Sequence, residues 1–306
     1  MMNLLLGTDD FIIKTEQLNN TLFSKHDVSV SMLRLDTIHP VLSGNKIFKL
    51  RYFLDEALNS IHKRIVTFGG AYSNHLAATA FACNVKRLRS IGIVRGERPP
   101  VLSSTLLFCT QNRMQLEFTS RVLYRQINHE EFDNALTKKF GAHTFIPEGG
   151  FSPMGANGAK LITGYFNSKN YTHICCAVGT ATTFAGLITG CDFETEVLGF
   201  GILKNLHDIG VRLRKTGVDG RKNYSYNGDY HFGGYAKKSV ELISFINSFY
   251  RETQIPLDFV YTGKMMFGVY DLINKNYFPQ GSKILCIHTG GLQGNESLPP
   301  GTLNFF

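Results

Sequence analysis

A lysine in a tight turn is the first residue of this chain that could carry covalent chemistry. Lys46 follows a Ser-Gly-Asn sequence at 43–45 and leads into a stretch that is typical of the start of a helix. A helix N-terminus and cationic neighbours would lower the pKa of the Lys46 amine, as an amine that attacks a carbonyl carbon requires. Most lysines are solvated surface residues, so Lys46 indicates a reactive amine only together with companion motifs.

A run of small residues and hydroxyls could bind a phosphate. The segment 179–187 follows the apolar run 173–178 and contains Thr180, Thr182 and Thr183. Small residues let the backbone approach a ligand, and a helix that starts here would add free N–H groups and the positive end of its dipole. The segment matches neither a Walker loop nor Gly-x-Gly-x-x-Gly. An ordinary capped helix start is the alternative interpretation.

Polar residues after another strand-like run could bind a carboxylate. Ser73, Asn74 and His75 follow the glycine pair 69–70 and precede the helix-length stretch 76–83. The helix N–H groups and the Ser73 hydroxyl would face a bound carboxylate, and simple N-capping is the alternative. We expect His75 to border the same pocket, although a packed polar helix residue is equally compatible with the sequence.

Two tyrosines and two threonines complete the candidate set late in the chain. Tyr235 follows the glycine pair 233–234, and Tyr261 and Thr262 follow an expected strand at 258–260. Thr289 ends the strand-like run 283–288 and precedes a further glycine pair. Each of these positions, taken alone, is compatible with ordinary packing.

The elements that must position these residues alternate between two periodicities. Strand-like runs occur at 64–68, 89–94, 115–119, 143–146, 172–178, 196–201, 258–260 and 283–288. Helix-length amphipathic stretches occur at 52–60, 76–83, 126–138, 156–167, 237–251 and 265–274. This alternation predicts βαβ units and an α/β fold with mainly parallel sheets. Because ligands bind at the carboxyl ends of parallel strands, the glycine-rich strand exits suggest one shared crevice.

Composition excludes several classes of protein. The 306 residues are 43% hydrophobic, without an apolar run long enough to span a membrane, and the first residues lack the basic start of a secretory signal. The formal net charge is +8, but the basic residues are dispersed, which argues against nucleic acid. The six cysteines form no Cys-x-x-Cys pair and no set with metal-ligand spacing. We therefore expect a cytoplasmic protein with reduced thiols, no metal site, and neither nucleic acid nor a membrane as partner.

Taken together, the motifs resemble one enzyme family. Gly-Asn-Lys is followed by Ser-Asn-His, with Ser73 27 positions after Lys46, Tyr261 26 positions after Tyr235, and Thr289 28 positions after Tyr261. With the Gly/Thr segment, these separations resemble the pyridoxal-phosphate enzymes that include D-cysteine desulfhydrase and 1-aminocyclopropane-1-carboxylate deaminase. The resemblance extends from about residue 33 to residue 291.

The resemblance implies roles for the cofactor-binding residues. Lys46 would form the internal aldimine with pyridoxal 5'-phosphate, and Asn74 would bind the 3-hydroxyl of the cofactor. Thr262 would face the pyridine nitrogen, with Thr289 close by. The phosphate would be held by Lys49 and by the segment Gly179, Thr180, Ala181, Thr182 and Thr183.

The resemblance also implies which residues handle the substrate, a small amino acid. Ser73 would bind its carboxylate or assist proton transfer, together with Asn74 and His75. Tyr235 and Tyr261 would line the substrate face and take part in catalysis. Glu148, which precedes a glycine pair, would alter the entrance of the pocket.

The architecture implied by the resemblance is tryptophan-synthase-β-like. Two three-layer α/β domains with mainly parallel sheets would hold the cofactor in the cleft between them. Residues 1–49 and 146–306 would form the larger domain, and residues 50–145 a small inserted domain. The resemblance also implies a homodimer.

Two positions discriminate between substrates in this family. The cyclopropane deaminases carry Glu and Leu where this chain has Thr262 and Thr289, the pair typical of D-cysteine desulfhydrases. We therefore expect a lyase that converts D-cysteine to pyruvate, ammonia and hydrogen sulfide. Deamination of 1-aminocyclopropane-1-carboxylate is the alternative. A non-catalytic cofactor- or ligand-binding relic is a further one, suggested by Phe48 in place of the family's usual Arg and by the short chain.

Overall fold

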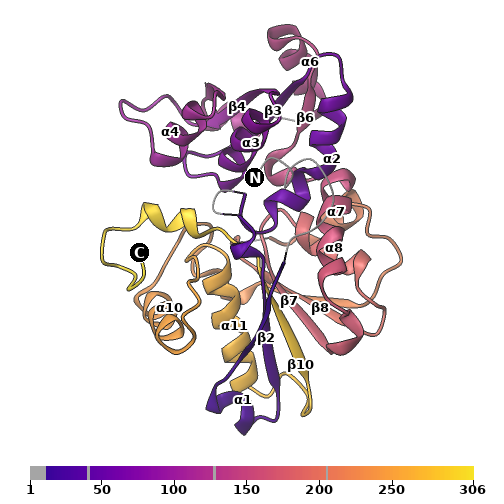
Figure 1. The fold of residues 1–306 in the computed structure, drawn as a ribbon, viewed down its shortest axis with the longest axis vertical. Coiled ribbons are helices and arrows are strands. Elements are labelled where there is room, and N and C mark those ends of the chain that lie inside the picture. The colour runs from indigo at the N-terminus through magenta and orange to yellow at the C-terminus, as the bar shows by residue number, and fades with distance from the viewer. Residues whose placement is uncertain (1–11, 40–41, 127–128, 205) are drawn as a thin grey trace.

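Two mainly parallel sheets, each covered by helices, form two lobes in the computed structural model (Figure 1). The structure describes residues 12–39, 42–126, 129–204 and 206–306. We call the lobe built on the six-stranded sheet the large lobe and the one built on the four-stranded sheet the small lobe. The predicted α/β class is confirmed by this architecture.

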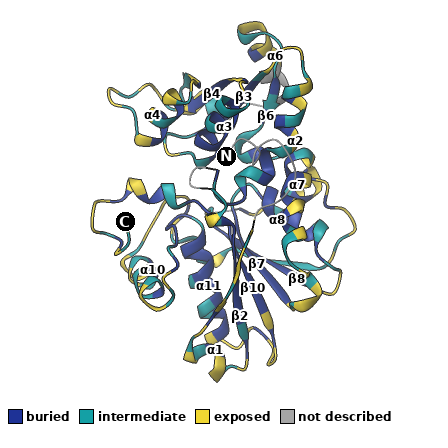
Figure 2. Ribbon diagram, viewed as in Figure 1, coloured by how far each residue is buried: buried dark blue, intermediate teal, exposed yellow. Residues whose placement is uncertain are grey.

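The sheet of the large lobe has the strand order β1-β2-β10-β7-β8-β9 within the described residues. Only β1 is antiparallel to its neighbour. Its strands are β1 (Thr15–Leu18), β2 (Ser29–Arg34), β7 (His173–Val178), β8 (Glu196–Gly201), β9 (Tyr224–Asn227) and β10 (Lys283–His288). Every residue of β7 is buried, as expected for a central parallel strand that is covered on both faces (Figure 2).

Helices cover both faces of the large sheet. Cys175 and Ala177 of β7 pack with the helices of one face, and the alternate residues Ile174 and Cys176 pack with those of the other, as the two-residue period of a strand requires. The first face carries α1 (Thr21–Lys25), α10 (Val240–Thr253) and α11 (Thr262–Asn274). The second carries α7 (Pro153–Lys160), α8 (Thr182–Gly190) and α9 (Ile209–Lys215).

The sheet of the small lobe is entirely parallel, with the order β5-β4-β3-β6. Its strands are β3 (Arg64–Gly69), β4 (Arg89–Arg95), β5 (Gln115–Thr119) and β6 (Thr144–Ile146). Ile65 packs with one helical layer and Val66 with the opposite one, so this lobe also has three layers. The helices are α2 (Lys46–Asn59), α3 (Asn74–Val85), α4 (Ser104–Gln111), α5 (Arg121–Gln126) and α6 (His129–Phe140).

Three helices join the lobes through close backbone packing. In Figure 1, α2, α7 and α8 lie one below the other where the lobes meet. A Cβ on Gly158 of α7 would come 2.2 Å from the backbone oxygen of Phe48 in α2, and one on Gly186 of α8 would come 2.7 Å from that of Ala156 in α7. Only glycine permits these approaches, which bring the first turn of α2 next to the first turn of α8.

The structure corrects several predicted elements. The strand predicted at 258–260 is wrong, because these residues form a turn in front of α11. Helix α2 begins at Lys46 rather than at 52. Helix α7 starts earlier than predicted and ends at Lys160, where a 3-10 helix, Leu161–Tyr165, continues the chain. Strands β1, β2 and β9 were not predicted, and residues 127–128 of the helix predicted at 126–138 lie outside the described residues.

Candidate active site

A glycine turn places Lys46 between the two lobes. A Cβ on Gly44 would lie 1.8 Å from the backbone oxygen of Thr289, and the φ of Gly44 is +72°, so this turn requires glycine. The same oxygen accepts hydrogen bonds from the backbone N–H of Asn45 at 3.2 Å and from Lys46 Nζ at 3.4 Å. Asn45 Nδ2 also donates to Thr183 Oγ1 at 2.7 Å. The start of α2 is thus fixed to the residue that follows β10 and to the first turn of α8.

Two lysines of α2 present amines with low pKa values. Burial lowers the pKa of Lys46 to about 8, although the nearby carboxylate of Asp258 acts in the opposite direction. Burial and the charge of Lys46 lower the pKa of Lys49 to about 7, and Lys49 Nζ donates to the backbone oxygen of Gly149 at 2.8 Å. Within the described residues, neither amine forms an ion pair with a carboxylate. Two such amines suit a ligand that is both a carbonyl compound and an anion.

The loop between β7 and α8 offers backbone groups to the same space. Ala181 adopts a left-handed conformation with a φ of 75°, and α8 begins directly after it. Thr180 Oγ1 and Thr182 Oγ1 lie 2.9 Å apart, and a Cβ on Gly149 would come 2.8 Å from Thr180 Cγ2. The N-terminus of α8 therefore lies beside the segment that receives Lys49, and this combination of N–H groups, hydroxyls and an amine suits a phosphate.

The start of α3 brings Ser73 and Asn74 to the site. Ser73 Oγ accepts from the backbone N–H of Leu76 at 3.2 Å, so the N-cap considered as the alternative is present, and the hydroxyl proton stays available. Asn74 Nδ2 lies 3.5 Å from the backbone oxygen of Gly291, and Asn74 Oδ1 is buried without a hydrogen-bond partner. A buried polar atom without a partner is uncommon, and it fits a ligand that supplies a hydrogen bond here.

His75 is directed into the small lobe. Its Nε2 lies 2.9 Å from Thr67 Oγ1 of β3, and its ring is buried. Burial and the charges of Lys49 and Lys46 lower its pKa to about 3, so the ring stays neutral at physiological pH. Packing against β3 is therefore what the structure shows for His75, and only Nδ1 lacks a partner.

Tyr261 and Tyr235 form the wall opposite the lysines. Their ring centroids lie 6.1 Å apart at an interplanar angle of 74°, and Lys46 Nζ lies 5.8 Å from the centroid of Tyr261. Burial raises the pKa of both phenols, and each hydroxyl contacts the other. Both tyrosines therefore keep their protons at neutral pH. Tyr235 remains 41% exposed, which places it on the solvent side of the pair.

Asp258 organises the turn before α11, and the sequence did not reveal this role. Its buried carboxylate accepts the backbone N–H groups of Val260, Tyr261 and Thr262 at 2.9, 2.7 and 2.9 Å. It also accepts the Thr262 hydroxyl at 2.6 Å, and the backbone N–H of Asp258 donates to that hydroxyl oxygen at 3.0 Å. The hydroxyl proton of Thr262 is therefore donated to Asp258 and not to a ligand. An acidic residue shortly before the start of a helix is the signal that could have indicated this cap.

The structure thus brings most of the predicted residues to the region between the lobes. Lys46 contacts Tyr261 and Thr289. Lys49 and Asn74 lie against the backbone oxygens of Gly149 and Gly291. The hydroxyl of Thr262 and the ring of His75 are engaged elsewhere. His288, at the end of β10, is fully buried and accepts the N–H of Gly290 at 3.2 Å. Sequence reasoning missed the contacts of Asn45, Asp258 and Lys264.

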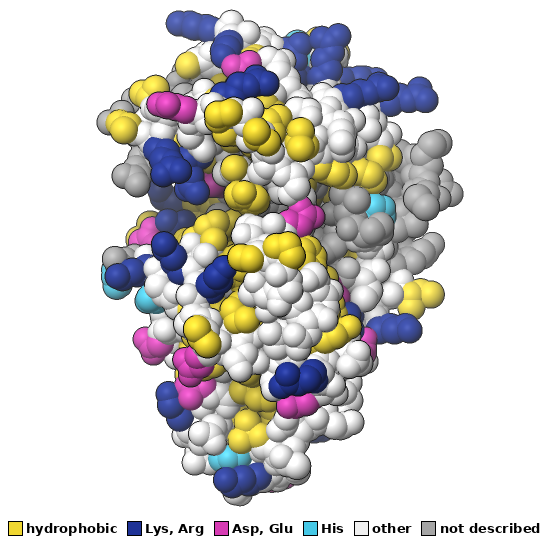
Figure 3. All heavy atoms as spheres, turned by 90° about the vertical axis from the view of Figure 1, so that its left-hand side faces the viewer, with side chains coloured by type: hydrophobic (Ala, Val, Ile, Leu, Met, Phe, Trp, Pro, Cys, Tyr) yellow, Lys and Arg dark blue, Asp and Glu magenta, His cyan; other side chains and the backbone are white. Residues whose placement is uncertain are grey.

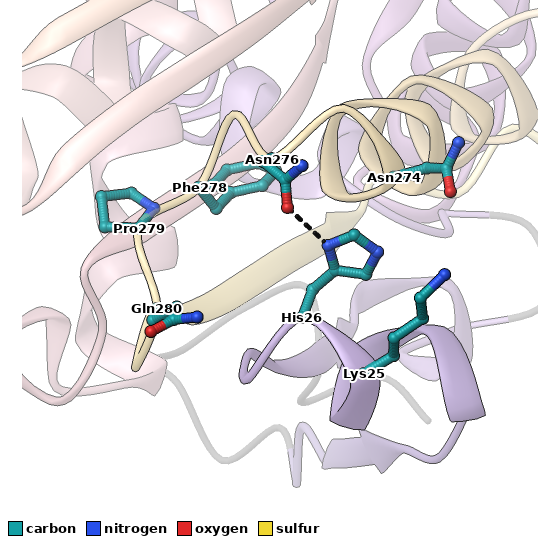
Figure 4. Close-up of a pocket in the computed structure, with 7 residues that line it drawn as sticks. All are labelled: Lys25, His26, Asn274, Asn276, Phe278, Pro279 and Gln280. Carbon is teal, nitrogen blue, oxygen red and sulfur yellow. Dashed lines mark hydrogen bonds between the residues drawn. The ribbon is translucent and has the colours of Figure 1, made fainter.

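Two surface pockets lie outside this region. The one in Figure 4 has a volume of about 610 Å³. It is lined by residues that precede β2 and β10, such as His26 and Gln280, and so lies at the N-terminal ends of these strands, whereas the site lies at their carboxyl ends. The other, of about 810 Å³, is lined by Tyr52 and by residues of 154–164. Neither contains a residue of the candidate site, so neither is taken as the catalytic cleft.

Comparison with known families identifies the chain. Residues 10–290 match the model of the family described as pyridoxal-phosphate dependent enzyme. The chain belongs to this family. Its cofactor is therefore pyridoxal phosphate, as predicted, and the geometry fits: an amine for the aldehyde, an N-terminal cradle for the phosphate and the partnerless Asn74 Oδ1 for a polar ring substituent.

Individual relatives support the same assignment. A putative 1-aminocyclopropane-1-carboxylate deaminase of Thermotoga maritima is 31% identical over 293 residues, covering 89% of this chain and 92% of the relative. A bifunctional D-cysteine desulfhydrase/1-aminocyclopropane-1-carboxylate deaminase of Arabidopsis thaliana, mitochondrial by its name, is 31% identical over 291 residues, covering 83% of this chain and 70% of the relative.

The solved structures agree with the fold. The crystal structure of a deaminase homologue superposes with a TM-score of 0.77 at 27% identity, covering 95% of this chain and 92% of the other. O-ureido-L-serine synthase superposes with a TM-score of 0.68 at 15% identity, covering 97% of this chain and 96% of that one, which supports the fold alone. The family resemblance predicted from the sequence is confirmed.

The described residues also bear on metals, membranes, thiols and surface charge. In the described residues, no group of three or more His, Cys, Asp or Glu side chains could hold a metal ion. No described helix is both long and apolar enough to cross a membrane. The six cysteines are free and buried. On the face drawn in Figure 3, Lys and Arg side chains are spread over both lobes rather than gathered in one stripe.

Proposed function

We propose that this pyridoxal-phosphate enzyme cleaves D-cysteine to pyruvate, ammonia and hydrogen sulfide. The observation that carries the proposal is Thr262, a neutral and fully buried residue directly after Tyr261. A carboxylate at this position would keep a pyridine nitrogen protonated and strengthen the ring as an electron sink. Expulsion of hydrosulfide needs less of that help than opening of a cyclopropane ring, because hydrosulfide departs readily.

The cofactor would be held by groups from both lobes. Lys46 Nζ would bind its aldehyde carbon, Lys49 and the backbone of 179–183 its phosphate, and Asn74 its 3-hydroxyl. When bound, pyridoxal phosphate supplies the electron sink that accepts the Cα–H electron pair, while the protein supplies orientation and electrostatics. Thr289 supports this placement, since its backbone oxygen contacts Lys46 Nζ at 3.4 Å.

Proton transfer would be divided between Lys46 and the tyrosines. With a pKa of about 8, the amine of Lys46 is partly neutral near neutral pH and can accept the Cα proton once the substrate amine has displaced it. Tyr261 and Tyr235 keep their protons because burial raises their pKa values, so either can donate to the departing sulfur. Water then replaces the amino nitrogen of the substrate, which leaves as ammonia. The overall reaction converts D-cysteine and water to pyruvate, ammonia and hydrogen sulfide. Each general acid or base typically contributes about 10²–10⁴-fold.

Substrate binding would rely on the start of α3. The Ser73 hydroxyl keeps its proton free while its oxygen caps the helix, so it can donate to the substrate carboxylate. His75 would support this end of the pocket from its place against β3. The charge of Glu148 adds to the rise in the pKa values of Tyr235 and Tyr261, so Glu148 lies close enough to influence the entrance.

Deamination of 1-aminocyclopropane-1-carboxylate is the second candidate. It is favoured by the carboxylate of Asp258, which lies 2.6 Å from Thr262 Oγ1 and brings a negative charge close to the position where the deaminases carry Glu. A non-catalytic relic is less well supported. Phe48, which suggested it, packs into the core of the large lobe against Tyr165, at a centroid distance of 5.7 Å, so it serves there as a core residue.

Product assays separate these candidates. The protein, saturated with pyridoxal phosphate, is incubated separately with D-cysteine, L-cysteine and 1-aminocyclopropane-1-carboxylate, and sulfide, pyruvate and 2-oxobutyrate are measured. We expect sulfide and pyruvate in equal amounts from D-cysteine and at least about tenfold slower formation of 2-oxobutyrate. Faster formation of 2-oxobutyrate would reverse the order of the two candidates, and no turnover of any of the three would favour the relic.

Organisation beyond the site is part of the same proposal. We propose a cytoplasmic homodimer with an inserted domain at 50–145 between the parts 1–49 and 146–306 of a larger one. The position of the small sheet, whose strands lie between Arg64 and Ile146, supports the inserted domain. Light scattering during size-exclusion chromatography tests the dimer: a mass near twice 34.3 kDa supports it, and a mass of 34.3 kDa would exclude it.

A further inference from the structure

We propose that Lys264 is a positioning residue that holds the loop of Tyr235 against Tyr261. The role of Tyr235 in this inference rests on the proposed function. Lys264 is the third residue of α11 and is fully buried. Its Nζ donates to the backbone oxygen of His231 at 2.9 Å and to that of Gly234 at 2.7 Å. The ammonium group therefore connects the helix that begins next to Tyr261 with the residue directly before Tyr235.

The loop at 231–236 has a backbone that needs such a connection. Phe232, Gly233, Gly234 and Ala236 all have positive φ values, of 52°, 90°, 117° and 53°. Non-glycine residues reach this region only at a cost in conformational free energy, and they persist where surrounding contacts hold them. Consecutive left-handed residues also cannot form a regular ladder of backbone hydrogen bonds. The loop keeps backbone hydrogen bonds from Gly234 to His231 and from Lys237 to Gly234, and a buried ammonium that binds two of its carbonyl oxygens adds a restraint from α11.

The geometry of the tyrosine pair depends on this restraint. Tyr235 is 41% exposed, so packing around its own side chain restricts it less than a core position would. Its ring nevertheless meets that of Tyr261 edge to face, with centroids 6.1 Å apart. Lys264 holds Gly234, and Asp258 holds Tyr261 through a 2.7 Å hydrogen bond. The positions of both rings therefore depend on contacts at the start of α11.

The buried charge of Lys264 indicates that this residue does more than stabilise the fold. Burial of an ammonium group is unfavourable, and an apolar side chain of similar length would fill the space without that cost. Burial lowers the pKa of Lys264 to about 8, and the charge of Asp258 opposes this change. Among the described residues, Lys264 Nζ forms hydrogen bonds with two carbonyl oxygens, and both belong to this loop. The buried amine is thus used to hold that loop.

A second tether from the same helix gives a matched control. The Tyr230 hydroxyl donates to Asp271 Oδ2 at 2.6 Å, one residue before the loop and further along α11. Tyr230→Phe removes this hydrogen bond without touching the backbone oxygens that Lys264 binds. It should lower stability without a specific effect on Tyr235. Lys264→Met removes the ammonium group and keeps the chain length, and Lys264→Gln is the second variant if the methionine protein does not fold.

A double-mutant cycle tests the route through Tyr235. Lys264→Met is made in the wild-type chain and in the Tyr235→Ala chain, each saturated with pyridoxal phosphate. We expect kcat/KM for D-cysteine to fall at least about tenfold in the wild-type background and less than about twofold in the Tyr235→Ala background, because coupled residues are not additive. Equal losses in both backgrounds would overturn the proposal, since a merely structural lesion affects both alike. Tyr230→Phe should show no such coupling.

Hydrogen exchange tests the same proposal without catalysis. The backbone N–H of Gly234 donates to His231, and that of Lys237 donates to Gly234. We expect these amides to exchange at least about tenfold faster in the Lys264→Met protein without cofactor, with the amides in the middle of α11 unchanged. Unchanged exchange in the loop would overturn the proposal. If the wild-type protein turns over no amino acid, the proposed function fails and this measurement still decides the role of Lys264.

Discussion

Lys46 and Lys49 lie three residues apart on one face of α2, so a single helical turn presents both amines to the region between the lobes. Their shared environment explains why neither is an ordinary lysine: burial lowers both pKa values, and the charge of Lys46 lowers the pKa of Lys49 further. The amine for covalent chemistry and the amine for an anion thus come from one short segment.

The covalent role of Lys46 predicts the effect of its removal. Lys46→Ala should reduce turnover of D-cysteine by at least about 10³-fold, because the amine both binds the cofactor and moves the Cα proton. Steady-state sulfide production is the measurement, and Lys169→Ala, at a solvent-exposed lysine, is the control with unchanged rates. Wild-type-like rates in the Lys46→Ala protein would contradict the assignment.

The lowered pKa of Lys49 predicts a pH dependence of stability. The folded value is about 7, and the ordinary value is 10.5, so between these pH values the unfolded chain binds more protons than the folded protein. The stability of the wild type relative to Lys49→Met should therefore rise as the pH increases from 7 towards 10.5, and stay constant below about 7.

Urea titrations of both cofactor-free proteins at several pH values measure this difference. The buried cysteines also titrate differently on unfolding, but they are common to both proteins and cancel in the comparison. A difference that is independent of pH, or one that falls as the pH rises, would show that Lys49 keeps an ordinary pKa in the folded protein.

The turn before α11 shows what a sequence pattern does and does not reveal about an element. The apolar residues after Asp258 favoured a strand, yet the Asp258 carboxylate accepts three consecutive backbone N–H groups and closes a turn instead. A strand signal of three residues is weak, and a buried side-chain cap depends on contacts that periodicity does not carry. By contrast, the strands from β3 to β8 that lie in longer apolar runs were predicted within one or two residues.

The cap predicts a large loss of stability. Asp258→Ala would leave buried N–H groups of Val260, Tyr261 and Thr262 without an acceptor, at a cost of about 1–3 kcal/mol for each group that finds no water. We expect a total loss of at least about 3 kcal/mol in the free energy of unfolding, measured by urea denaturation. Ser239→Ala removes an ordinary N-cap hydrogen bond of α10, of 3.1 Å, and should cost only about 1 kcal/mol. Equal effects of the two variants would contradict the role of Asp258.

The segment around Gly149, which contacts the loop before α8, predicts an effect on cofactor affinity. Gly149 has a φ of +66°, and a Cβ there would come 2.8 Å from Thr180 Cγ2. Gly149→Ala should therefore displace the segment that accepts the Lys49 hydrogen bond and weaken binding of pyridoxal phosphate at least about tenfold, as measured by absorbance titration. Gly164→Ala is the matched control, because no atom lies within 4 Å of its added Cβ and its φ is ordinary. Unchanged affinity in the Gly149→Ala protein would show that the segment at 148–150 does not support cofactor binding.

At the scale of the whole molecule, the site depends on two parallel sheets whose carboxyl ends are brought together. Asn74 follows β3 of the small lobe, whereas Thr180 and Thr289 follow β7 and β10 of the large lobe. Motif spacing could predict the set of residues, since each follows a strand. It could not predict that His75 packs against Thr67 or that Lys264 binds a loop thirty residues earlier, because these contacts arise only when the helices are packed.

The reaction of the assembled enzyme with D-cysteine tests the central claim most directly. The protein is loaded with pyridoxal phosphate, freed of excess cofactor, and its visible absorption spectrum is recorded before and after D-cysteine is added, while sulfide and pyruvate are measured in the same sample. The account predicts a cofactor absorption band that changes at once on addition and equal, continuing release of both products. A protein that retains no cofactor band, or a band that D-cysteine leaves unchanged without release of sulfide, would contradict it.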